Sequence, residues 1–237
     1  MMSENDNSQY LQDLYPFLHN KSKDPEQDEI GLLESVKQKS IASIDTKRVF
    51  FADNAQALVN AARAIATVYK NTGRMYAMGN GGSSCDAAHF CVEFQHPVTA
   101  GRPALAAMNL LADAAMNSAV SNDVGFQHIF VRQLNAHAQQ GDGLVGFSTS
   151  GCSDNLMAAY ATAKEMDLVT LGFAGGDGGE MKSSGLVDHC LVVDSDSIHR
   201  IQETHVACYH IIWDLVHTLL ADSRGPVSKE NQTGSTL

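Results

Sequence analysis

The sequence has no cysteines spaced as a disulfide or metal-binding motif. Its five cysteines are odd in number and scattered, without a CxxC pair: Cys85, Cys91, Cys152, Cys190 and Cys208. Neither a disulfide framework nor a zinc ribbon is indicated, because both need cysteines in matched or closely spaced sets. A reducing compartment is expected.

Long apolar runs are also absent. No stretch of about 18 apolar residues occurs, which argues against a membrane-spanning helix. The N-terminus, MMSENDNSQYLQDLYPFLHN, lacks the basic start and apolar segment of a secretory signal. The sequence therefore predicts a cytoplasmic protein without a membrane partner.

Positive charge is scarce. Lys and Arg total 16 against 27 Asp and Glu, so the net charge is −11. This balance repels nucleic-acid backbones and anionic membranes, and no nucleic-acid partner is expected. A small anionic ligand is still allowed, because backbone N–H groups create locally positive sites. Apolar residues make up 44% of the chain, enough for a full core.

Five short apolar segments predict buried strands. They are RMYAMG, ALAAMNL, GLVGFS, LVTLGFA and HCLVVD, at 74–79, 104–110, 143–148, 168–174 and 189–194. Helical stretches follow the first four, and a long amphipathic helix from Ser197 to Ala221 follows the fifth. Because parallel strands need crossover helices, this order predicts a three-layer α/β/α fold with a doubly wound, five-stranded parallel sheet. Ligands of such sheets bind at the carboxyl ends of the strands.

The two ends of the chain are polar. Residues 1–27 are expected to form an N-terminal extension with one short helix around Tyr10 to Leu18, and residues 223–237 a flexible tail. Two helical patterns are expected between Ile30 and about Asn71.

Two loops at strand ends are candidates for anion binding. The first strand ends in GNGGSS, residues 79–84, where glycines let a ligand approach and Ser83 or Ser84 is expected to cap the next helix. It has neither the G-x-G-x-x-G register nor a P-loop pattern. The third strand ends in STSGCS, residues 148–153, with four hydroxyl groups before a helix. Either loop alone could be a polar turn, but the two together favour a phosphate-type ligand.

Candidate acid–base or metal-binding groups lie on two helices. His89 and Glu93 are four residues apart and so share a helix face. Gln202 and His210 differ by about 80° around the C-terminal helix. His205 lies about 140° from His210 and is the less suitable partner.

A single helix histidine is more often a surface or core residue than a catalyst. This applies to His217 as well, although its angle around the helix does not exclude it from the site of His210. His89 and Glu93 beside a phosphate-type loop favour function. Such groups could move a proton between neighbouring carbons of a hydroxy-ketone or hold a divalent ion.

Three sequence blocks carry a family resemblance: GNGGSSCDAAHFCVEF, STSGCSDN and RIQETHVACYHII. They closely resemble the sugar isomerase (SIS) domain family, and within it the phosphoheptose isomerases. The resemblance runs from about residue 30 to 222 and includes RPALAAMNL, SNDVGF and GGDGGEM. It implies a flavodoxin-like SIS domain at 28–222. It also implies conversion of sedoheptulose 7-phosphate to D-glycero-D-manno-heptose 7-phosphate, which feeds lipopolysaccharide core synthesis in Gram-negative bacteria, and a homotetramer with shared active sites.

The resemblance also implies roles for individual residues. Glu93 resembles the family's base and His210 its acid. One Zn²⁺ per subunit would be held by His89, Glu93, Gln202 and His210, with no nucleotide or redox cofactor. The implied sugar-phosphate contacts are Asn80, Gly81, Gly82, Ser83, Glu93, Asn122, Asp123, Ser148, Thr149, Ser150, Ser153 and Gln202.

The sequence leaves other functions open. After Glu93 the family often has a basic segment, whereas this chain has FQHP and only Arg102 further on. One alternative is an isomerase for another ketose phosphate. The other is a non-catalytic SIS protein, either a sugar-phosphate-binding regulator or a replication-initiator-binding factor. Those relatives typically lack the histidine and glutamate pair, so His89 and Glu93 favour an enzyme.

The flanking helices predict assembly into an oligomer. Apolar residues occur on more than one face of two helices: Val59, Ala62, Ile65 and Val68 in the first, and Ile201, Val206, Ile211, Ile212, Trp213, Leu215 and Leu219 in the second. One sheet is not expected to cover so wide a surface, so symmetry mates are expected to pack against it.

Overall fold

A computed structural model describes residues 25–222 of the chain. The chain divides into two compact units, with the boundary between Ile44 and Asp45. In the first unit the described residues, 25–44, are all helical. The short helix expected around 10–18, nearly all of the 1–27 extension and the 223–237 tail lie outside the described residues.

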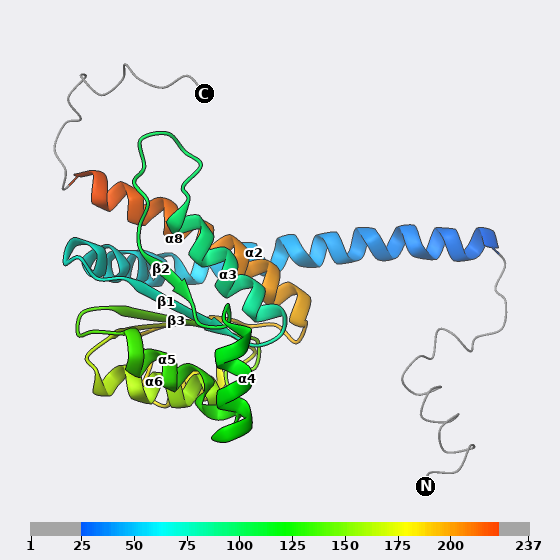
Figure 1. Ribbon diagram of the computed structural model, residues 1–237. Helices are drawn as coiled ribbons and strands as arrows, with labels where there is room; N and C mark the ends of the chain where they lie inside the picture. The colour runs from blue at the N-terminus through cyan, green and yellow to red at the C-terminus, as the bar shows by residue number, and fades with distance from the viewer. Residues whose placement is uncertain (1–24, 223–237) are drawn as a thin grey trace, which may run out of the picture. The chain divides into compact units, whose positions relative to one another are not determined.

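The second unit is built on a parallel sheet of five strands (Figure 1). The strands are β1 (Met75–Gly79), β2 (Ala107–Asn109), β3 (Gly143–Ser148), β4 (Val169–Gly175) and β5 (His189–Val193). Their order is β2-β1-β3-β4-β5, and all four neighbouring pairs are parallel. The predicted three-layer, doubly wound fold is therefore confirmed.

Helices cover both faces of this sheet (Figure 1). They are α2 (Pro25–Lys70), α3 (Gly82–Gln95), α4 (Ala114–Asp123), the 3-10 helix η2 (Phe126–His128), α5 (Ile129–His137), α6 (Asp154–Glu165), α7 (Gly179–Ser183) and α8 (Ile198–Asp222). One core joins the sheet to α3, α8 and the part of α2 in the second unit, and the other joins it to α4, α5, α6 and α7. In residues 25–222 no helix is both long and apolar enough to cross a membrane.

The expectation of two separate helices between Ile30 and Asn71 is wrong, because α2 is continuous. No proline follows Pro25 within the helix, and Gly31 is its only glycine, so no residue interrupts the hydrogen-bonded ladder. The helix ends at Lys70, followed by Thr72 with a φ of 64°.

Both cores follow from the alternation of side chains along the strands. Ala77 of β1 and Val145 of β3 face the first core, whereas the adjacent Met78 and Leu144 face the second. Many of the apolar residues that were expected to pack against symmetry mates are buried within this chain. Ala62, Ile65, Val68, Ile201 and Ile212 are at most 3% exposed. The expectation was wrong for these residues, because neighbouring helices cover one another as well as the sheet.

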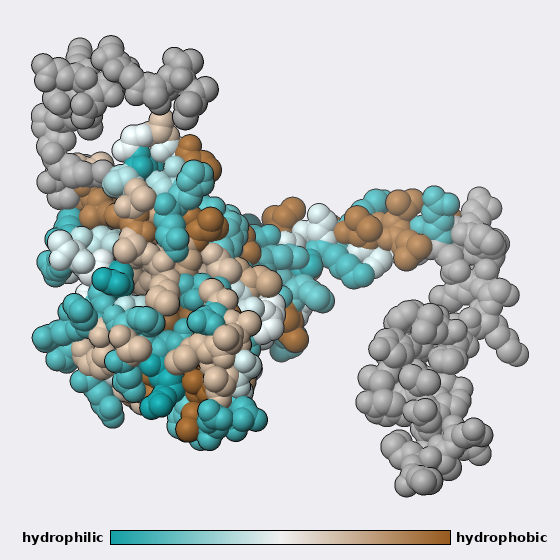
Figure 2. All heavy atoms as spheres, viewed as in Figure 1, coloured by the Kyte–Doolittle hydropathy of each residue, from teal (hydrophilic) through white to brown (hydrophobic). Residues whose placement is uncertain are grey.

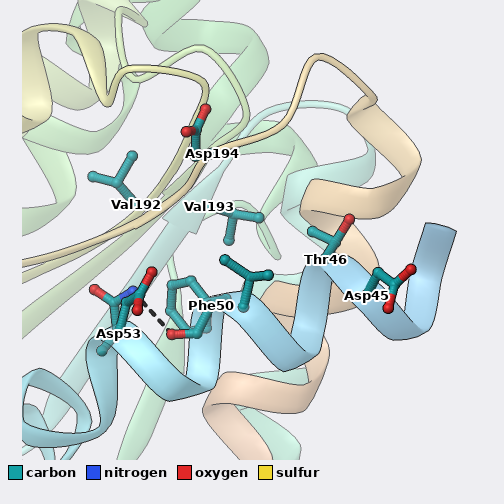
Figure 3. A pocket seen from close by; sticks show the side chains of 9 residues that line it. Asp45, Thr46, Phe50, Asp53, Val192, Val193 and Asp194 are labelled. Carbon is teal, nitrogen blue, oxygen red and sulfur yellow. Dashed lines mark hydrogen bonds between the residues drawn. The ribbon is translucent and has the colours of Figure 1, made fainter.

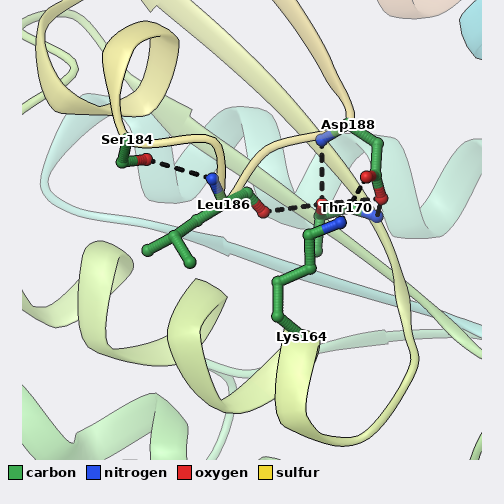
Figure 4. Close-up of polar contacts among 5 residues, drawn as sticks. All are labelled: Lys164, Thr170, Ser184, Leu186 and Asp188. Carbon is green, nitrogen blue, oxygen red and sulfur yellow. Dashed lines mark hydrogen bonds and ion pairs between the residues drawn. The ribbon is translucent and has the colours of Figure 1, made fainter.

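Polar contacts join β4 to the start of β5 (Figure 4). Thr170 is fully buried; its N–H donates to Asp188 Oδ2 at 3.0 Å and its hydroxyl to the Leu186 carbonyl at 2.8 Å. Lys164 of α6 forms an ion pair with Asp188. Burial alone would raise the pKa of Asp188, but the bonds from Lys164 and Thr170 outweigh it and lower that pKa. The ionised carboxylate thus stabilises this edge of the sheet.

The strand order places a switch point at the carboxyl ends of β1 and β3. From β1 the chain proceeds to β2 on one side, and from β3 it proceeds to β4 on the other. Ligands of open α/β sheets bind where the connections diverge in this way. The two candidate loops follow these neighbouring strands, so both lie at the switch point.

Candidate active site

The two loops are joined by a pair of asparagines. Asn80, after β1, and Asn155, in the first turn of α6, each donate an amide N–H to the other's oxygen at 2.9 Å. Asn155 is buried, and this reciprocal pair fixes the spacing of the two loops. Sequence reasoning did not single out Asn155, although it ends the STSGCSDN block.

The loop after β1 starts α3 through a glycine. Gly81 is the N-cap residue, with a φ of 53° that favours glycine, and no side chain caps the helix. The expected cap from Ser83 or Ser84 is therefore wrong. Both serines lie inside the first turn, where Ser83 is buried and Ser84 donates its hydroxyl to the Gly81 carbonyl at 2.6 Å. A Cβ on Gly82 would lie 2.4 Å from Gln202 Nε2, so Gln202 of α8 packs directly against this loop.

The loop after β3 gathers three serine hydroxyls. The hydroxyl oxygen of Ser148 lies 3.1 Å from that of Ser153 and 3.4 Å from that of Ser150. The N–H of Gly151 donates to Ser148 Oγ at 3.1 Å, which holds the turn in place. Ser153 is the N-cap of α6 but forms no side-chain cap bond. These hydroxyls lie at a helix N-terminus and can donate to an anion there. Thr149 is half-buried beside them.

Helices α3 and α8 bring three side chains together. One potential ligand atom from each of His89, Glu93 and His210 lies within 4.8 Å of the others. His89 Nε2 is 3.1 Å from Glu93 Oε1, and the rings of His89 and His210 have centroids 5.0 Å apart. All three residues are partly exposed, so the cluster is open to a small molecule. Two imidazoles and a carboxylate are suitable donors for a divalent metal ion.

Burial and neighbouring charges tune this cluster. Burial and then His89 lower the pKa of His210, and Glu93 only partly opposes them, so His210 is more readily neutral. Burial raises the pKa of Asp86 to about 6, although His89 opposes this. Burial, followed by the charges of Asp86 and Glu93, raises the pKa of Tyr209, so its hydroxyl keeps its proton.

Two aromatic residues of α8 hold the α3 side of the cluster. The hydroxyl oxygen of Tyr209 lies 2.7 Å from His89 Nδ1, and Trp213 Nε1–H donates to the Glu93 carbonyl at 2.7 Å. Sequence reasoning missed both contacts. Trp213 is three residues after His210, so helical periodicity could have placed it on the same side.

The other histidines of α8 lie elsewhere. His205 is fully buried against Phe147 and Phe173, and its Nε2 lies 3.1 Å from the Ala174 carbonyl. His217 is also buried and packs against aromatic rings of the first core. Neither belongs to the three-residue cluster.

Asn122 and Asp123 form the C-terminal end of α4. Both are exposed, and the Asn122 amide donates to Asp123 Oδ1 at 2.9 Å. Among residues 25–222, no hydrogen bond joins this pair to the two loops or to the histidine cluster. Within the described residues, the structure therefore shows no direct bond between this pair and the other candidate contacts.

Arg102 is engaged by α8. Its guanidinium donates to Asp214 Oδ1 at 2.6 Å and lies 4.4 Å from the centroid of the Trp213 ring. These contacts hold the segment between α3 and β2 against α8. The one cation noted after Glu93 is thus directed towards α8.

A separate hollow of about 320 Å³ lies between α2 and the end of β5 (Figure 3). Its lining includes Asp45, Asp53 and Asp194, together with Phe50 and Val193. Three carboxylates make it unfavourable for a phosphate-bearing ligand. The switch point beside the serine hydroxyls is therefore the better candidate for an anionic sugar.

Comparisons with known proteins agree with this geometry. Residues 41–175 match the SIS domain family. A phosphoheptose isomerase from Aneurinibacillus thermoaerophilus is 37% identical over 185 residues, covering 76% of this chain and 91% of the relative. One from Helicobacter pylori is 39% identical over 161 residues, covering 68% and 83%.

Solved structures give the same result. The phosphoheptose isomerase GmhA from Neisseria gonorrhoeae matches with a TM-score of 0.74 and 35% identity, covering 79% of this chain and 99% of that one. A phosphoheptose isomerase from Francisella tularensis matches with a TM-score of 0.75 and 30% identity, covering 78% and 98%. The chain therefore belongs to the SIS domain family and, within it, to the phosphoheptose isomerases.

Proposed function

We propose that this protein is an aldose–ketose isomerase that converts sedoheptulose 7-phosphate to D-glycero-D-manno-heptose 7-phosphate. The observation that carries the proposal is the cluster of His89, Glu93 and His210 on α3 and α8. It supplies a carboxylate base and imidazole acids close to an anion-binding loop. The substrate is inferred from the names of the relatives.

In this proposal the phosphate binds at the N-terminus of α6. The helix dipole and serine hydroxyls favour a negative charge there even though the net charge is −11. The glycine loop and Gln202 contact the sugar hydroxyls. The proposed contacts are Asn80, Gly81, Gly82, Ser83, Glu93, Asn122, Asp123, Ser148, Thr149, Ser150, Ser153 and Gln202.

The proposed chemistry is a proton transfer between neighbouring carbons. Glu93 removes a proton from C1 of the open-chain ketose, and the C1–H electrons form the C1=C2 bond of an enediol. His210 protonates the former C2 carbonyl oxygen and accepts the proton of the C1 hydroxyl. The proton held by Glu93 then returns to C2, which leaves the carbonyl at C1. The lowered pKa of His210 favours the neutral form, which can accept the C1 hydroxyl proton, and it also makes the protonated form a stronger acid for donation to the C2 oxygen.

The same cluster fits one Zn²⁺ per subunit. His89, Glu93 and His210 would supply two nitrogens and an oxygen, and Gln202 a fourth, weaker ligand. Ligands of tetrahedral zinc lie roughly 3.4 Å from one another, so atoms within 4.8 Å need only small side-chain rotations. When bound, the ion would polarise the substrate carbonyl and stabilise developing negative charge.

The proposal also covers assembly and location. We expect a cytoplasmic homotetramer with shared active sites, in which residues 28–222 form the SIS domain. The five thiols support a reducing compartment, because all are free. Apolar residues exposed on the described surface support association, including Ile41, Ile44 and Ile211.

The direct test is Glu93→Gln, which keeps the shape of the side chain but removes the base. Turnover of sedoheptulose 7-phosphate should fall by at least about 10²-fold, because general base catalysis is lost. The product can be followed by NMR, and substrate binding by calorimetry. Glu165→Gln, at the exposed end of α6, should retain normal turnover and serves as the matched control. Near-normal turnover in Glu93→Gln would overturn the assignment.

A further inference from the structure

Tyr209 is a buried residue of α8 whose hydroxyl contacts the candidate site. It lies one residue before His210, and its oxygen is 2.7 Å from His89 Nδ1. The two rings meet edge to face, with centroids 5.3 Å apart. The contact crosses from α8 to α3, so it fixes the His89 ring relative to the helix that carries His210.

The protonation of His89 follows from its two neighbours. An ionised Glu93 carboxylate only accepts hydrogen bonds, so the 3.1 Å contact with His89 Nε2 requires a proton on Nε2. Neutral imidazole carries one proton, which leaves Nδ1 as an acceptor. Tyr209 then donates its hydroxyl proton to Nδ1. Both ring nitrogens are satisfied in this arrangement.

The opposite tautomer can use the same hydroxyl. If Nε2 gives up its proton to bind a cation, the ring proton moves to Nδ1 and needs an acceptor. The oxygen of Tyr209 can accept it, because a phenol is both donor and acceptor. On α3, one turn before His89, Asp86 has a buried Oδ2 without a hydrogen-bond partner in the described part of the chain. The charge of Asp86 acts on the Tyr209 hydroxyl, because it contributes to raising the pKa of Tyr209 after burial.

We infer that Tyr209 is a positioning residue, whose hydroxyl holds His89 so that Nε2 faces Glu93 in either tautomer. Its effect on turnover rests on the proposed function, whereas its effect on the His89 tautomer does not. Without the hydroxyl the ring loses its anchor at Nδ1, and a productive orientation of Nε2 is populated less often. Mutation of the residues that hydrogen-bond to metal-binding histidines commonly lowers metal affinity or activity by about 10- to 100-fold.

The test compares Tyr209→Phe with Tyr76→Phe. Both keep a buried ring and lose one hydroxyl, because the Tyr76 hydroxyl donates to the His137 carbonyl at 2.7 Å on the other side of the sheet. In Tyr209→Phe we expect zinc affinity, measured by competition with a chromophoric chelator, to fall by about 10-fold. We expect kcat for sedoheptulose 7-phosphate to fall by a similar factor, with KM changed less than about twofold. In Tyr76→Phe all three should stay within about twofold of the wild type.

Nitrogen NMR of metal-free protein gives a readout independent of activity. At about pH 8, where an ordinary imidazole is neutral, the wild type should show His89 protonated at Nε2, with Nδ1 accepting a hydrogen bond. The His89 signal is assigned by its loss in His89→Gln. Tyr209→Phe should show a mixture of tautomers. Wild-type tautomer and zinc affinity in that variant would overturn the inference.

The outcomes separate the two proposals. A wild type without isomerase activity would refute the proposed function, while the tautomer and zinc affinity would still decide the role of Tyr209. If Tyr209→Phe fails to fold, the wild-type spectrum decides, because a His89 Nδ1 that neither accepts nor donates a hydrogen bond in the metal-free protein excludes the contact with Tyr209 in either tautomer.

Discussion

His205 and His210 show how strongly position decides what a histidine does. They lie on one helix, five residues apart, yet His205 is buried beside the first core and His210 is partly exposed beside His89. Burial lowers the pKa of His205 to about 4, since a charged imidazole would lose its hydration there, and the bond to Ala174 opposes this only partly. His205 is therefore a neutral core residue that donates Nε2–H to a carbonyl of β4.

This burial predicts a pH dependence of stability. The folded pKa of His205, about 4, lies below the ordinary value of 6.5, so the unfolded chain binds the proton more readily. Stability due to neutral His205 is present above about pH 6.5 and is lost as the pH falls towards 4. At pH 5 the loss is about 2 kcal/mol. His205→Gln can still donate to Ala174 but does not titrate, so it should lose less stability between pH 7 and pH 5 than the wild type.

Thermal unfolding followed by circular dichroism measures this difference. Between pH 7 and pH 5, the Tm of the wild type should fall by roughly 4–8 °C more than the Tm of His205→Gln. His199→Gln is the matched control, because His199 is exposed on the same helix, and it should behave as the wild type does. Equal pH dependence in the wild type and His205→Gln would contradict the assignment.

At the scale of elements, the loop between β3 and α6 is the strongest candidate for phosphate binding. Its backbone is held by bonds from Gly151 and Cys152 to the hydroxyls of Ser148 and Ser150. Ser148 is buried, whereas Ser150 is exposed, and its hydroxyl can donate to a ligand while it accepts the bond from Cys152. A preformed loop of this kind binds an anion without first having to order its backbone.

Ser150→Ala should therefore weaken substrate binding more than catalysis. A hydrogen bond to a charged group contributes about 1.5 to 3 kcal/mol, so KM should rise by roughly 10-fold or more while kcat changes little. Steady-state kinetics with sedoheptulose 7-phosphate gives both constants. Ser183→Ala, which removes a hydroxyl bonded within α7, should leave both unchanged. A fall in kcat at constant KM would argue against phosphate binding by this loop.

Strands and loops were predictable because their signals are local. The five apolar segments, the glycine loop and the hydroxyl loop were found from patterns within a few residues, and the strand order placed the two loops together. The pairing of α3 with α8 was implied only by the family resemblance, because helix angles relate residues on one helix. Tyr209 was missed because its bond to His89 joins residues 120 positions apart. The glycine N-cap was also missed, since serine is the commoner cap and only the backbone geometry shows Gly81 in that position.

At the scale of the whole molecule, an acidic protein can bind an anion through groups that lie close to the ligand. The net charge of −11 acts over long distances and disfavours phosphate in general. Helix N-termini and hydroxyls act within one hydrogen bond of the ligand, where the distant carboxylates are screened. Because these short-range contacts outweigh screened distant charges, the acidic hollow near Asp194 and the serine loop can coexist in one fold.

The first unit exposes an unusual amount of apolar surface. Figure 2 shows hydrophobic side chains gathered along its helix. Ile30, Leu33, Ile41 and Ile44 are each 58–63% exposed, and they fall within about 80° of one another around the helix. Lys37 interrupts this apolar stripe, but so much exposed apolar surface is costly in water and is typical of an interface. A second copy of the chain is the natural partner, given the expected homo-oligomer.

Leu33→Glu should therefore reduce the size of the assembly. A charge in place of Leu33 would have to be desolvated in the interface, whereas the exposed helix itself tolerates it. Light scattering should show the wild type at a multiple of its 25.5 kDa chain mass and Leu33→Glu at a smaller multiple. Gln38→Glu adds a similar charge to an exposed position about 100° from the centre of the stripe and should leave the mass unchanged. Because shared active sites need intact neighbours, turnover should fall together with the mass. A folded monomer with full turnover would refute shared sites, and an unchanged mass in Leu33→Glu would refute this stripe as the interface.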